Sequence, residues 1–481
     1  MGQYEIGSVK SFTVGEKKIN LNVEEELTED QKLIVKSYLR KIDIRVVPIM
    51  IILYLFGLID RGNIGAAIVN GLRDGLHLTS SEEGTATTIF YILYIVFETP
   101  SNMLLKKFRP HIWFALIGSC WAGACISLAF AKNGTNFIVS RALLGAFEAG
   151  FTPGVVGYLN YWYTRSEVGK RMTIPISGMI GSPMSAGLAS AKLHTFKPYQ
   201  VIFLIEGCLT LFFCLLSFFI IQDYPDEAKF LTPEEHELCI RRLVAEQGMA
   251  SKTNNSLKNV LNVIADWKVW VFALIFFGFN NITINIGVFS PVIIKTMGFT
   301  GVTSTYLASL QSAGGFVGTL VAFYYVNKVP YFILLSIYGF ISVIGYGIMA
   351  FAKGTALRLF ALTLAGFGLN PTVVLALTWS SINQSGIYKG LIASAMIISF
   401  GTIPGATVPR LFVAKYSPDY IAAHSIILGF TVLSGLLSFI LGMYFKKENA
   451  RRDNNPVDLS HLSEFDQREM FNDHPNFRFR R

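Results

Sequence analysis

Twelve long apolar stretches separated by short polar turns occupy most of the 481-residue chain. Each is about 20 residues or longer, enough for a helix to cross a hydrocarbon core of about 30 Å. The alternating ten-residue segments of a membrane β-barrel are absent. The pattern therefore predicts an all-α integral membrane protein with twelve transmembrane helices. The predicted spans are 46–68, 85–105, 112–131, 136–161, 172–193, 200–221, 267–293, 303–326, 330–352, 356–380, 390–414 and 420–445.

A long polar interval divides these spans into two groups of six. Such equal halves suggest a duplicated bundle with a substrate path between the halves. The predicted domains are a cytoplasmic N-terminal tail (1–45), a six-helix bundle (46–221), a cytoplasmic linker (222–266), a second six-helix bundle (267–445) and a cytoplasmic C-terminal tail (446–481). Within the linker, Thr232 followed by proline and two glutamates predicts the start of a short capped helix that ends near Gly248.

The charged residues are concentrated outside the spans. Of 73 charged residues, 44 lie in the tails and the linker, so the rest of the chain has too few to coat a water-soluble surface. If both termini face the cytosol, 30 Lys and Arg residues lie on that side and 9 on the other, as the positive-inside rule requires. Membrane orientation thus explains the net charge of +9, and no nucleic-acid partner is expected.

The remaining chemistry of the sequence argues against an enzyme. Five cysteines in 481 residues are too sparse for a disulfide framework, and the seven histidines have no partner at ligand spacing. A Walker-type glycine loop and a nucleophile–base constellation are both missing. We therefore expect no metal, no cofactor and no enzymatic activity.

Six ionisable residues lie inside the predicted spans, namely Asp60, Arg61, Glu98, Arg141, Glu148 and Glu206. Each would cost several kcal/mol against lipid, so each should face a cavity or a partner. The helical rise places Asp60 and Arg141 at similar depth, where they would meet, with Glu148 two turns further along the same face. Static ion pairs between spans 1 and 4 are the structural alternative. We interpret Glu98 as a gate or helix-end contact and Glu206 as structural.

The second half offers only neutral polar groups in its predicted interior. They are Asn280, Asn281, Asn285, Gln311, Asn370 and Trp379. Of these, Asn281, Asn285 and Asn370 are candidate substrate contacts. Hydrogen bonds between helices are the alternative role for the asparagines of span 7.

Several motifs along the chain resemble those of one family. The motifs are Asp60-Arg61-Gly62-Asn63-Ile64-Gly65, Glu98-Thr99-Pro100-Ser101-Asn102, Lys106-Lys107-Phe108-Arg109-Pro110, the run from Arg141 to Gly154, and Tyr224-Pro225. Together they resemble the major facilitator superfamily in its anion:cation symporter branch, and within it the fungal allantoate permease family. Members of that family carry nicotinate, pantothenate, allantoate and similar compounds. The loop at 100–110 departs from the version common in sugar and drug carriers, which argues against those substrates.

The resemblance implies the major facilitator fold and a carrier that works by alternating access. It implies that Arg61 and Arg141 bind a carboxylate, and that Asp60 holds Arg141. It also implies proton coupling through Glu148 and Asp60, with Glu98 at a gate. With both acids ionised the two acids and two arginines sum to zero charge. Protonating Glu148 makes the site +1, so that an anion and a proton enter together.

The predicted function is therefore proton-coupled uptake of a small organic anion, with nicotinate as the best guess and allantoate or pantothenate next. The alternatives are an uncoupled uniporter and a nutrient sensor that no longer transports. We expect a monomer whose partners are the anion, protons and the lipid bilayer. The plasma membrane is the predicted location, with the endoplasmic reticulum or another internal membrane as the alternative.

Overall fold

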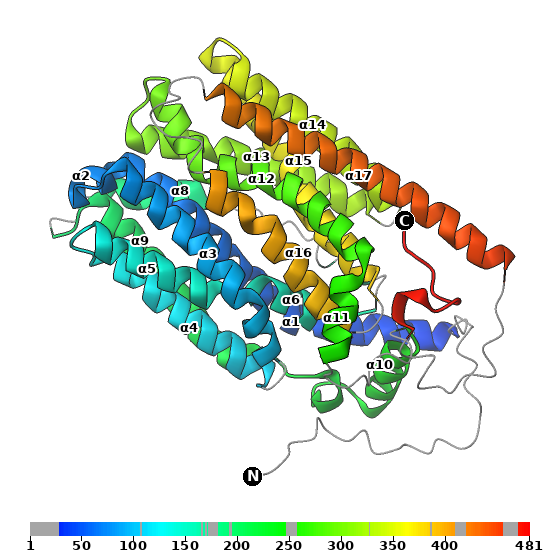
Figure 1. Cartoon of the computed structure of the whole chain (residues 1–481). Coiled ribbons are helices and arrows are strands. Elements are labelled where there is room, and N and C mark those ends of the chain that lie inside the picture. The colour runs from blue at the N-terminus through cyan, green and yellow to red at the C-terminus, as the bar shows by residue number, and fades with distance from the viewer. Residues whose placement is uncertain are drawn as a thin grey trace.

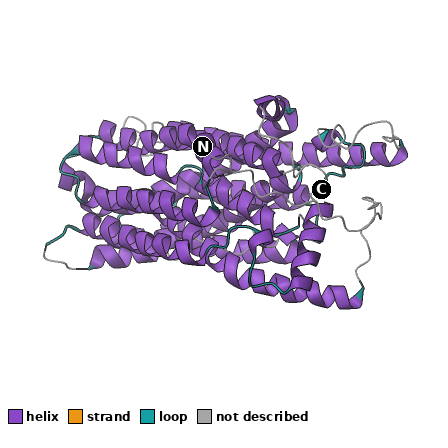
Figure 2. Cartoon of the chain, turned by 90° about the horizontal axis from the view of Figure 1, so that it is seen from below, coloured by secondary structure: helices purple, strands orange, loops and turns teal. Residues whose placement is uncertain are grey.

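The computed structural model describes the chain from residue 28 onward, with internal gaps. The described residues are 28–105, 108–164, 167–168, 171, 181–191, 195–246, 257–326, 328–384, 387–408, 420–455 and 470–481. All regular structure in these ranges is helical (Figure 2). Gly248, Lys106, Lys107 and parts of the fifth and eleventh predicted spans lie outside them.

The helices follow the predicted spans closely. In the first half they are α1 (Glu29–Ala67), η1 (Ile68–Leu72), α2 (Arg73–Leu76), α3 (Ser80–Leu105), α4 (Pro110–Ala129), α5 (Gly134–Glu148), α6 (Phe151–Trp162), α8 (Gly181–Ser190) and α9 (Pro198–Ile220). The linker contains η3 (Pro225–Glu227), α10 (Pro233–Glu246) and α11 (Leu257–Ala265). The second half and tail contain α12 (Trp267–Thr296), α13 (Gly301–Tyr325), α14 (Tyr331–Phe351), α15 (Thr355–Ile382), α16 (Ile387–Thr407), α17 (Ile421–Asn454) and η7 (Phe471–Asp473).

Nine helical stretches within the described ranges are long and apolar enough to cross a membrane. They are Glu29–Leu76, Pro110–Ala129, Gly134–Trp162, Pro198–Ile220, Trp267–Thr296, Gly301–Tyr325, Tyr331–Phe351, Thr355–Ile382 and Ile421–Asn454. The other three predicted spans correspond to α3, α8 and α16. Threonines, serines and glutamates make α3 more polar, and the described parts of α8 and α16 are short. These twelve segments match the twelve predicted spans.

The helices pack as two groups that lie side by side (Figure 1). In the N-terminal half α4 packs on α9 and α3 on α5, and in the C-terminal half α15 packs on both α13 and α14. The halves meet where α3 and α6 pack on α16, α8 on α13, and α1 on α12. A path between the halves would therefore be bounded by α1, α6, α12 and α16.

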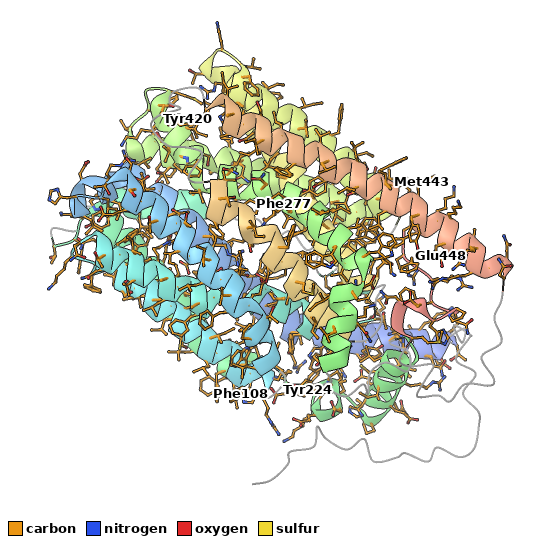
Figure 3. The ribbon with its side chains drawn as sticks, viewed as in Figure 1. Phe108, Tyr224, Phe277, Tyr420, Met443 and Glu448 are labelled. Carbon is orange, nitrogen blue, oxygen red and sulfur yellow. The ribbon has the colours of Figure 1, made fainter. Side chains whose placement is uncertain are left out.

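The two ends of the bundle differ in what covers them. We call the end that holds α10 and residues 470–481 the linker end, and the end that holds η1 and α2 the far end (Figure 1). In Figure 3, Glu448 marks the linker end of the C-terminal half and Tyr420 its far end. The excess of Lys and Arg predicts that the linker end faces the cytosol.

The linker helix α10 docks on the N-terminal half. The predicted capping box is present, because Thr232 N donates to Glu235 Oε2 at 2.9 Å and Glu235 N to Thr232 Oγ1 at 3.3 Å. Glu235 also pairs with Lys41 of α1 at 2.7 Å and accepts from Ser37. Burial alone would raise the pKa of Glu235, but hydrogen bonds from Lys41, the Thr232 backbone and Ser37 lower it to about 2.

Residues 470–481, which we call the docked tail, pack into the linker end of the C-terminal half. Phe479 is buried and stacks on Phe445 of α17, with ring centroids 4.4 Å apart. Arg480 N donates to Asn383 Oδ1 at 2.8 Å, and Arg480 O accepts from Trp379 Nε1 at 2.9 Å. Trp379, one of the neutral groups expected in the interior of the second half, therefore binds the docked tail.

Candidate functional site

The predicted fourth span is broken at its centre, where the sequence expectation was one continuous helix. α5 ends at Glu148, Gly150 adopts a left-handed φ of 81°, and α6 begins at Phe151. Pro153 explains the break, because it has no N–H to donate to the carbonyl of Ala149 and its ring would clash with that carbonyl. The break places the first turn of α6, which includes Thr152, directly after the acid.

An ion pair joins this break to α1. Arg61 Nε donates to Glu148 Oε1 at 2.5 Å, and Arg61 Nη2 reaches Tyr94 Oη at 3.1 Å and Thr152 Oγ1 at 3.4 Å. The Glu148 side chain is fully buried, whereas the Arg61 side chain is 24% exposed. Glu148 Oε2 has no hydrogen-bond partner among the described residues. Arg61 is thus the cation that reaches open space, and Glu148 is held behind it.

Asp60 directly precedes Arg61 in α1, but its side chain lies in a different environment. It is fully buried, and its Oδ2 accepts from Trp121 Nε1 at 2.8 Å. Its Oδ1 lies 3.4 Å from Cys125 Sγ and 3.5 Å from Asn63 Nδ2. The expected contact between Asp60 and Arg141 is wrong, since no ion pair joins them in the described part of the chain. A depth calculation gives no azimuth, and consecutive residues of α1 point about 100° apart.

Arg141 instead lies against an aromatic ring. Its guanidinium carbon is 4.7 Å from the centroid of Phe90, and the residue is almost fully buried. Its Nε and Nη1 have no hydrogen-bond partner within the described ranges. A buried arginine with unused donors is a site that an incoming carboxylate would satisfy.

Glu206 of α9 joins this cluster, although the sequence suggested a structural role near a helix end. It is fully buried, its Oε1 accepts from Ser185 Oγ at 2.6 Å, and its Oε2 accepts from Asn63 Nδ2 at 3.1 Å. Asn63 is the fourth residue of the Asp60 motif. The asparagine of that motif could therefore have predicted a hydrogen bond to a polar residue on another helix.

A cavity lies between this cluster and the linker end. Its lining residues are Val47, Met50, Ile51 and Tyr54 of α1, Thr152, Val155, Val156 and Leu159 of α6, Arg171, and Val374 and Leu377 of α15. Thr152 contacts Arg61, so the guanidinium lies at the cluster end of the cavity. The walls are mainly aliphatic, and the polar side chains among them are those of Tyr54, Thr152 and Arg171.

The far end of the path is closed by direct contact between the halves. A Cβ on Gly65 of α1 would lie 2.1 Å from the carbonyl oxygen of Val288 in α12, so the two helices touch through their backbones. Beside them, Asn70 Nδ2 donates to Thr305 Oγ1 at 3.1 Å and Lys295 Nζ to Val69 O at 3.2 Å.

Glu98 of α3 also bridges the halves. It is fully buried and accepts a hydrogen bond from Ser399 of α16. Nearby along the same helix pair, Thr88 Oγ1 donates to Ala406 O at 3.0 Å. A carboxyl between helices of different halves is in position to respond to their relative movement.

No hydrogen bond joins the candidate contacts of the second half to the ion pair among the described residues. Asn285 Nδ2 donates to Asn281 O at 2.7 Å and to its Oδ1 at 3.0 Å, while Asn285 Oδ1 has no partner in the described ranges. Asn370 Oδ1 accepts from Gln311 Nε2 at 3.4 Å, between α15 and α13. Asn280 Nδ2 bonds the Gly401 carbonyl of α16 at 2.9 Å. Helix bridging accounts for Asn280 and Asn370, and Asn285 retains an unused acceptor.

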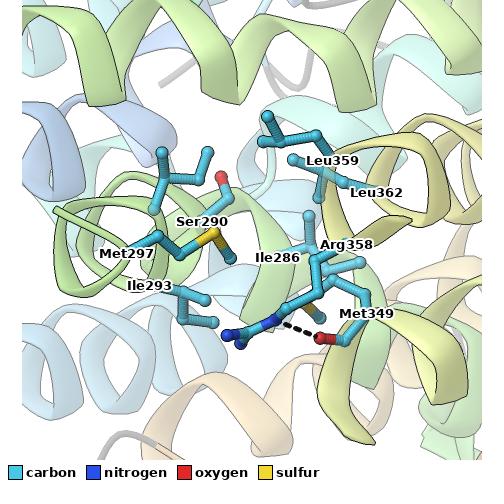
Figure 4. A pocket seen from close by; sticks show the side chains of 9 residues that line it. Ile286, Ser290, Ile293, Met297, Met349, Arg358, Leu359 and Leu362 are labelled. Atoms are coloured by element: carbon cyan, nitrogen blue, oxygen red, sulfur yellow. Dashed lines mark hydrogen bonds between the residues drawn. The ribbon is translucent and has the colours of Figure 1, made fainter. Parts of the chain in front are cut away.

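A second hollow lies toward the far end of the C-terminal half, and Figure 4 shows the side chains that line it. Its walls are almost entirely apolar and come from α12, α14 and α15. Arg358 is folded back so that its Nε donates to the Met349 carbonyl at 3.0 Å. Neither Arg61 nor Glu148 is among the residues that line it.

Comparison with known proteins assigns this architecture to a family. The family model of the Major Facilitator Superfamily matches residues 50–409. The chain belongs to the major facilitator superfamily. It is a multi-pass membrane transporter and not an enzyme, and the predicted twelve-helix fold is confirmed.

Two curated relatives and one solved structure are similar to the chain. The high-affinity nicotinic acid transporter of Saccharomyces cerevisiae is 28% identical over 434 residues, 87% of this chain and 79% of the relative. A putative tartrate transporter of Agrobacterium vitis is 34% identical over 268 residues, 54% of this chain and 60% of the relative. A solved proton:xylose symporter superposes with a TM-score of 0.63 at 13% identity, covering 83% of this chain and 95% of the other, which shows a shared fold.

Proposed function

We propose that the chain is a proton-coupled carrier of a small organic monocarboxylate, with nicotinate as the preferred candidate. In this proposal the linker end faces the cytosol and the monomer works in the plasma membrane. The nicotinic acid transporter among its relatives supports the substrate class. Its motifs also fit the fungal allantoate permease family.

The observation that supports the proposal best is the Arg61–Glu148 pair beside the cavity. Arg61 is partly exposed and Glu148 is fully buried, so a substrate carboxylate approaching through the cavity meets the arginine first. Both carboxylates compete for one guanidinium. Protonation of Glu148 releases Arg61 to the substrate, so binding of the anion and binding of a proton favour each other.

Arg141 is the second proposed anion contact, because its donors are buried and unused. Asn281, Asn285 and Asn370 are proposed to line the opposite side of the path when the halves move. Glu98 is proposed as a gate residue, since its bond to Ser399 must break if α3 and α16 separate. The halves would rock about the cluster and expose it alternately.

The walls of the cavity favour an aromatic substrate over a polyhydroxy acid. Most of the lining side chains are aliphatic and lack hydrogen-bonding groups. A flat apolar ring loses little on entering such a space, whereas each unpaired hydroxyl or ureido group costs free energy. This ranks nicotinate ahead of allantoate and pantothenate, and well ahead of tartrate.

Competitive uptake tests the proposal. The chain is expressed in cells lacking their own nicotinate uptake, and labelled nicotinate is supplied with excess nicotinate, pantothenate, allantoate, tartrate or glucose, with and without an uncoupler. We expect nicotinate to compete best, glucose not at all, and the uncoupler to abolish accumulation. Strongest competition by a neutral sugar would overturn the anion assignment. Uptake that ignores the uncoupler would indicate a uniporter, and absence of any flux a sensor.

A further inference from the structure

Glu206 and Asp60 form a buried pair of carboxyls that the Arg61–Glu148 pair does not neutralise. Both side chains are fully buried. The Nδ2 of Asn63 lies 3.5 Å from Asp60 Oδ1 and 3.1 Å from Glu206 Oε2, so one amide connects an acid of α1 with an acid of α9. We call these two acids the Asp60–Glu206 pair.

The other hydrogen-bond donors to this pair are neutral. Asp60 accepts from Trp121 and Cys125, and Glu206 accepts from Ser185. No Lys, Arg or His forms an ion pair with either carboxyl in the described part of the chain.

The charged groups that act on the pair from α5 are Arg141 and Glu148, which have opposite signs. Arg61 already neutralises Glu148, so Arg141 is the one remaining cation of the cluster. Ionising both Asp60 and Glu206 would bury two negative charges against that single positive charge, which is unfavourable in a low-dielectric interior.

The bridging amide is compatible with a proton on either acid. Asn63 Oδ1 is buried and has no hydrogen-bond partner among the described residues. In the orientation described, Nδ2 faces both carboxyls. If the amide turns over, Oδ1 takes the place of Nδ2 and accepts from the O–H of a protonated acid.

We propose that Asp60 and Glu206 share one proton through Asn63, and that Glu206 is a proton-holding residue of the carrier. Two carboxyls this close titrate as a unit, so the proton belongs to the pair and not to either acid. The inference rests on the proposed function only where it assigns that proton to transport. Its presence in the resting protein is a separate statement.

The charge balance of the transport step changes accordingly. The acids Asp60, Glu148 and Glu206 and the bases Arg61 and Arg141 sum to −1 when all are ionised. One proton on the Asp60–Glu206 pair makes the resting cluster neutral. A second proton, at Glu148, then accompanies the substrate anion. A carrier organised in this way holds one resident proton and exchanges another.

Infrared spectroscopy of the purified, substrate-free protein tests the resident proton directly. The wild type at pH 7 should show a carboxylic-acid carbonyl band that both Glu206→Gln and Asp60→Asn lack, because the remaining single acid ionises. Glu82→Gln at the far end, where the carboxyl caps Thr79, is the matched control and should keep the band. If Asp60→Asn keeps the band, the proton is not shared. If neither variant changes it, the pair holds no proton.

A third variant keeps the test decisive if Glu206→Gln fails to fold. Asn63→Leu removes the bridge but neither acid, so each acid should retain its own proton and the band should grow. An unchanged band in folded Asn63→Leu would overturn sharing through the amide.

Proton-driven uptake in liposomes then separates this inference from the proposed function. Loss of the band in both variants together with uptake that ignores a proton gradient would support the pair and refute coupled transport. Coupled uptake with an unchanged band would support the proposed function and refute the pair. If both statements hold, Glu206→Gln should alter the pH dependence of uptake while retaining substrate counterflow.

Discussion

In the N-terminal half, acids and bases lie in the middle of the helices, whereas in the C-terminal half the buried charged side chains lie at the helix ends. Lys268 and Lys389 pair with Asp266 at the linker end. In the middle of the described C-terminal helices the buried polar groups are neutral, as Asn281 and Asn285 illustrate. Each burial of charge is costly in a membrane, so the asymmetric distribution sets the N-terminal half apart as the site of the proposed proton coupling.

Both halves contain helices that touch through glycines, but such contacts are more frequent in the described C-terminal half. In the C-terminal half, α13 and α15 touch through glycines, and a Cβ on Gly366 would lie 1.9 Å from the Gln311 carbonyl. Such contacts make a tightly packed unit with little room for internal rearrangement. The comparison suggests that the N-terminal half binds the anion and the proton. The C-terminal half would then move as a rigid body and form one wall of the substrate path.

Neutralising Glu148 should give the largest effect and tests directly whether the two halves differ in function. In Glu148→Gln the amide keeps its size but cannot release a proton. We expect counterflow of substrate to continue while accumulation driven by a proton gradient disappears, measured in liposomes with an imposed pH gradient. Asn281→Ala in the C-terminal half is the matched variant and should still accumulate substrate. Normal accumulation by Glu148→Gln would exclude Glu148 as the coupling residue.

The next largest effect is expected at Arg61. Lysine keeps the charge but loses the planar fork that suits a carboxylate. We expect Arg61→Lys to raise the KM for substrate at least tenfold, which corresponds to about 1.4 kcal/mol, with normal delivery to the membrane. Arg141→Lys should show a similar change if Arg141 binds the anion, whereas Asn370→Ala should change KM by less. Equal effects in all three variants would contradict the asymmetry between halves.

The contact between the halves at the far end can be tested with two glycines of α1. Gly65→Ala would place its Cβ 2.1 Å from the Val288 carbonyl and should prevent tight closure, lowering uptake severalfold. Gly62→Ala is the control, because its nearest contact is 4.0 Å away. Labelling of an Asn70→Cys variant by a membrane-impermeant reagent should speed up with Gly65→Ala only. Equal labelling in both backgrounds would show that the far end does not depend on this contact.

The docked tail should affect stability without affecting affinity. Phe479→Ala removes the ring that stacks on Phe445, and we expect tail docking to weaken by about 3 kcal/mol. The measurement is the rate of proteolysis within residues 470–481, with the exposed Arg478→Ala as the control. The KM should stay within about twofold. A large change in KM would instead link the docked tail to the substrate path.

The smallest effect concerns the linker helix. The folded pKa of Glu235 is lowered to about 2 from 4.5, so its contribution to docking is present above pH 4.5 and is lost as the pH falls toward 2. Thermal unfolding between pH 7 and pH 3 should show a decrease for the wild type that is smaller in Glu235→Gln. At neutral pH the variant should transport normally. Identical pH profiles would mean that the Lys41–Glu235 pair does not stabilise the docked helix.

The sequence predicted the fold well because the bilayer imposes a simple length rule on apolar segments. It also identified most of the charged cluster, since charges inside spans are rare. It paired Asp60 with Arg141 wrongly, because depth along a helix says nothing about the direction of a side chain. The contact between Glu206 and Asn63 was not predicted, for the same reason. The break at Gly150 was readable in principle, as glycine is followed three residues later by proline.

The tail was the least predictable element. Its composition is polar and basic, so the sequence suggested a solvated segment that sets orientation. Besides the buried Phe479 ring, its attachment depends on main-chain atoms. The Arg480 and Arg481 carbonyls bond Trp379 and the Tyr331 N–H. Contacts through the backbone leave no pattern in side-chain chemistry. They appear only when the three-dimensional ends of α14 and α15 are known.

The seating of the tail makes it a reporter of assembly. Phe479 is buried and Arg480 N is bonded to Asn383, so residues 478–481 are not available as an extended peptide while the C-terminal half is packed. A chain in which α15 and α17 are not packed would leave this basic segment free for other proteins to bind.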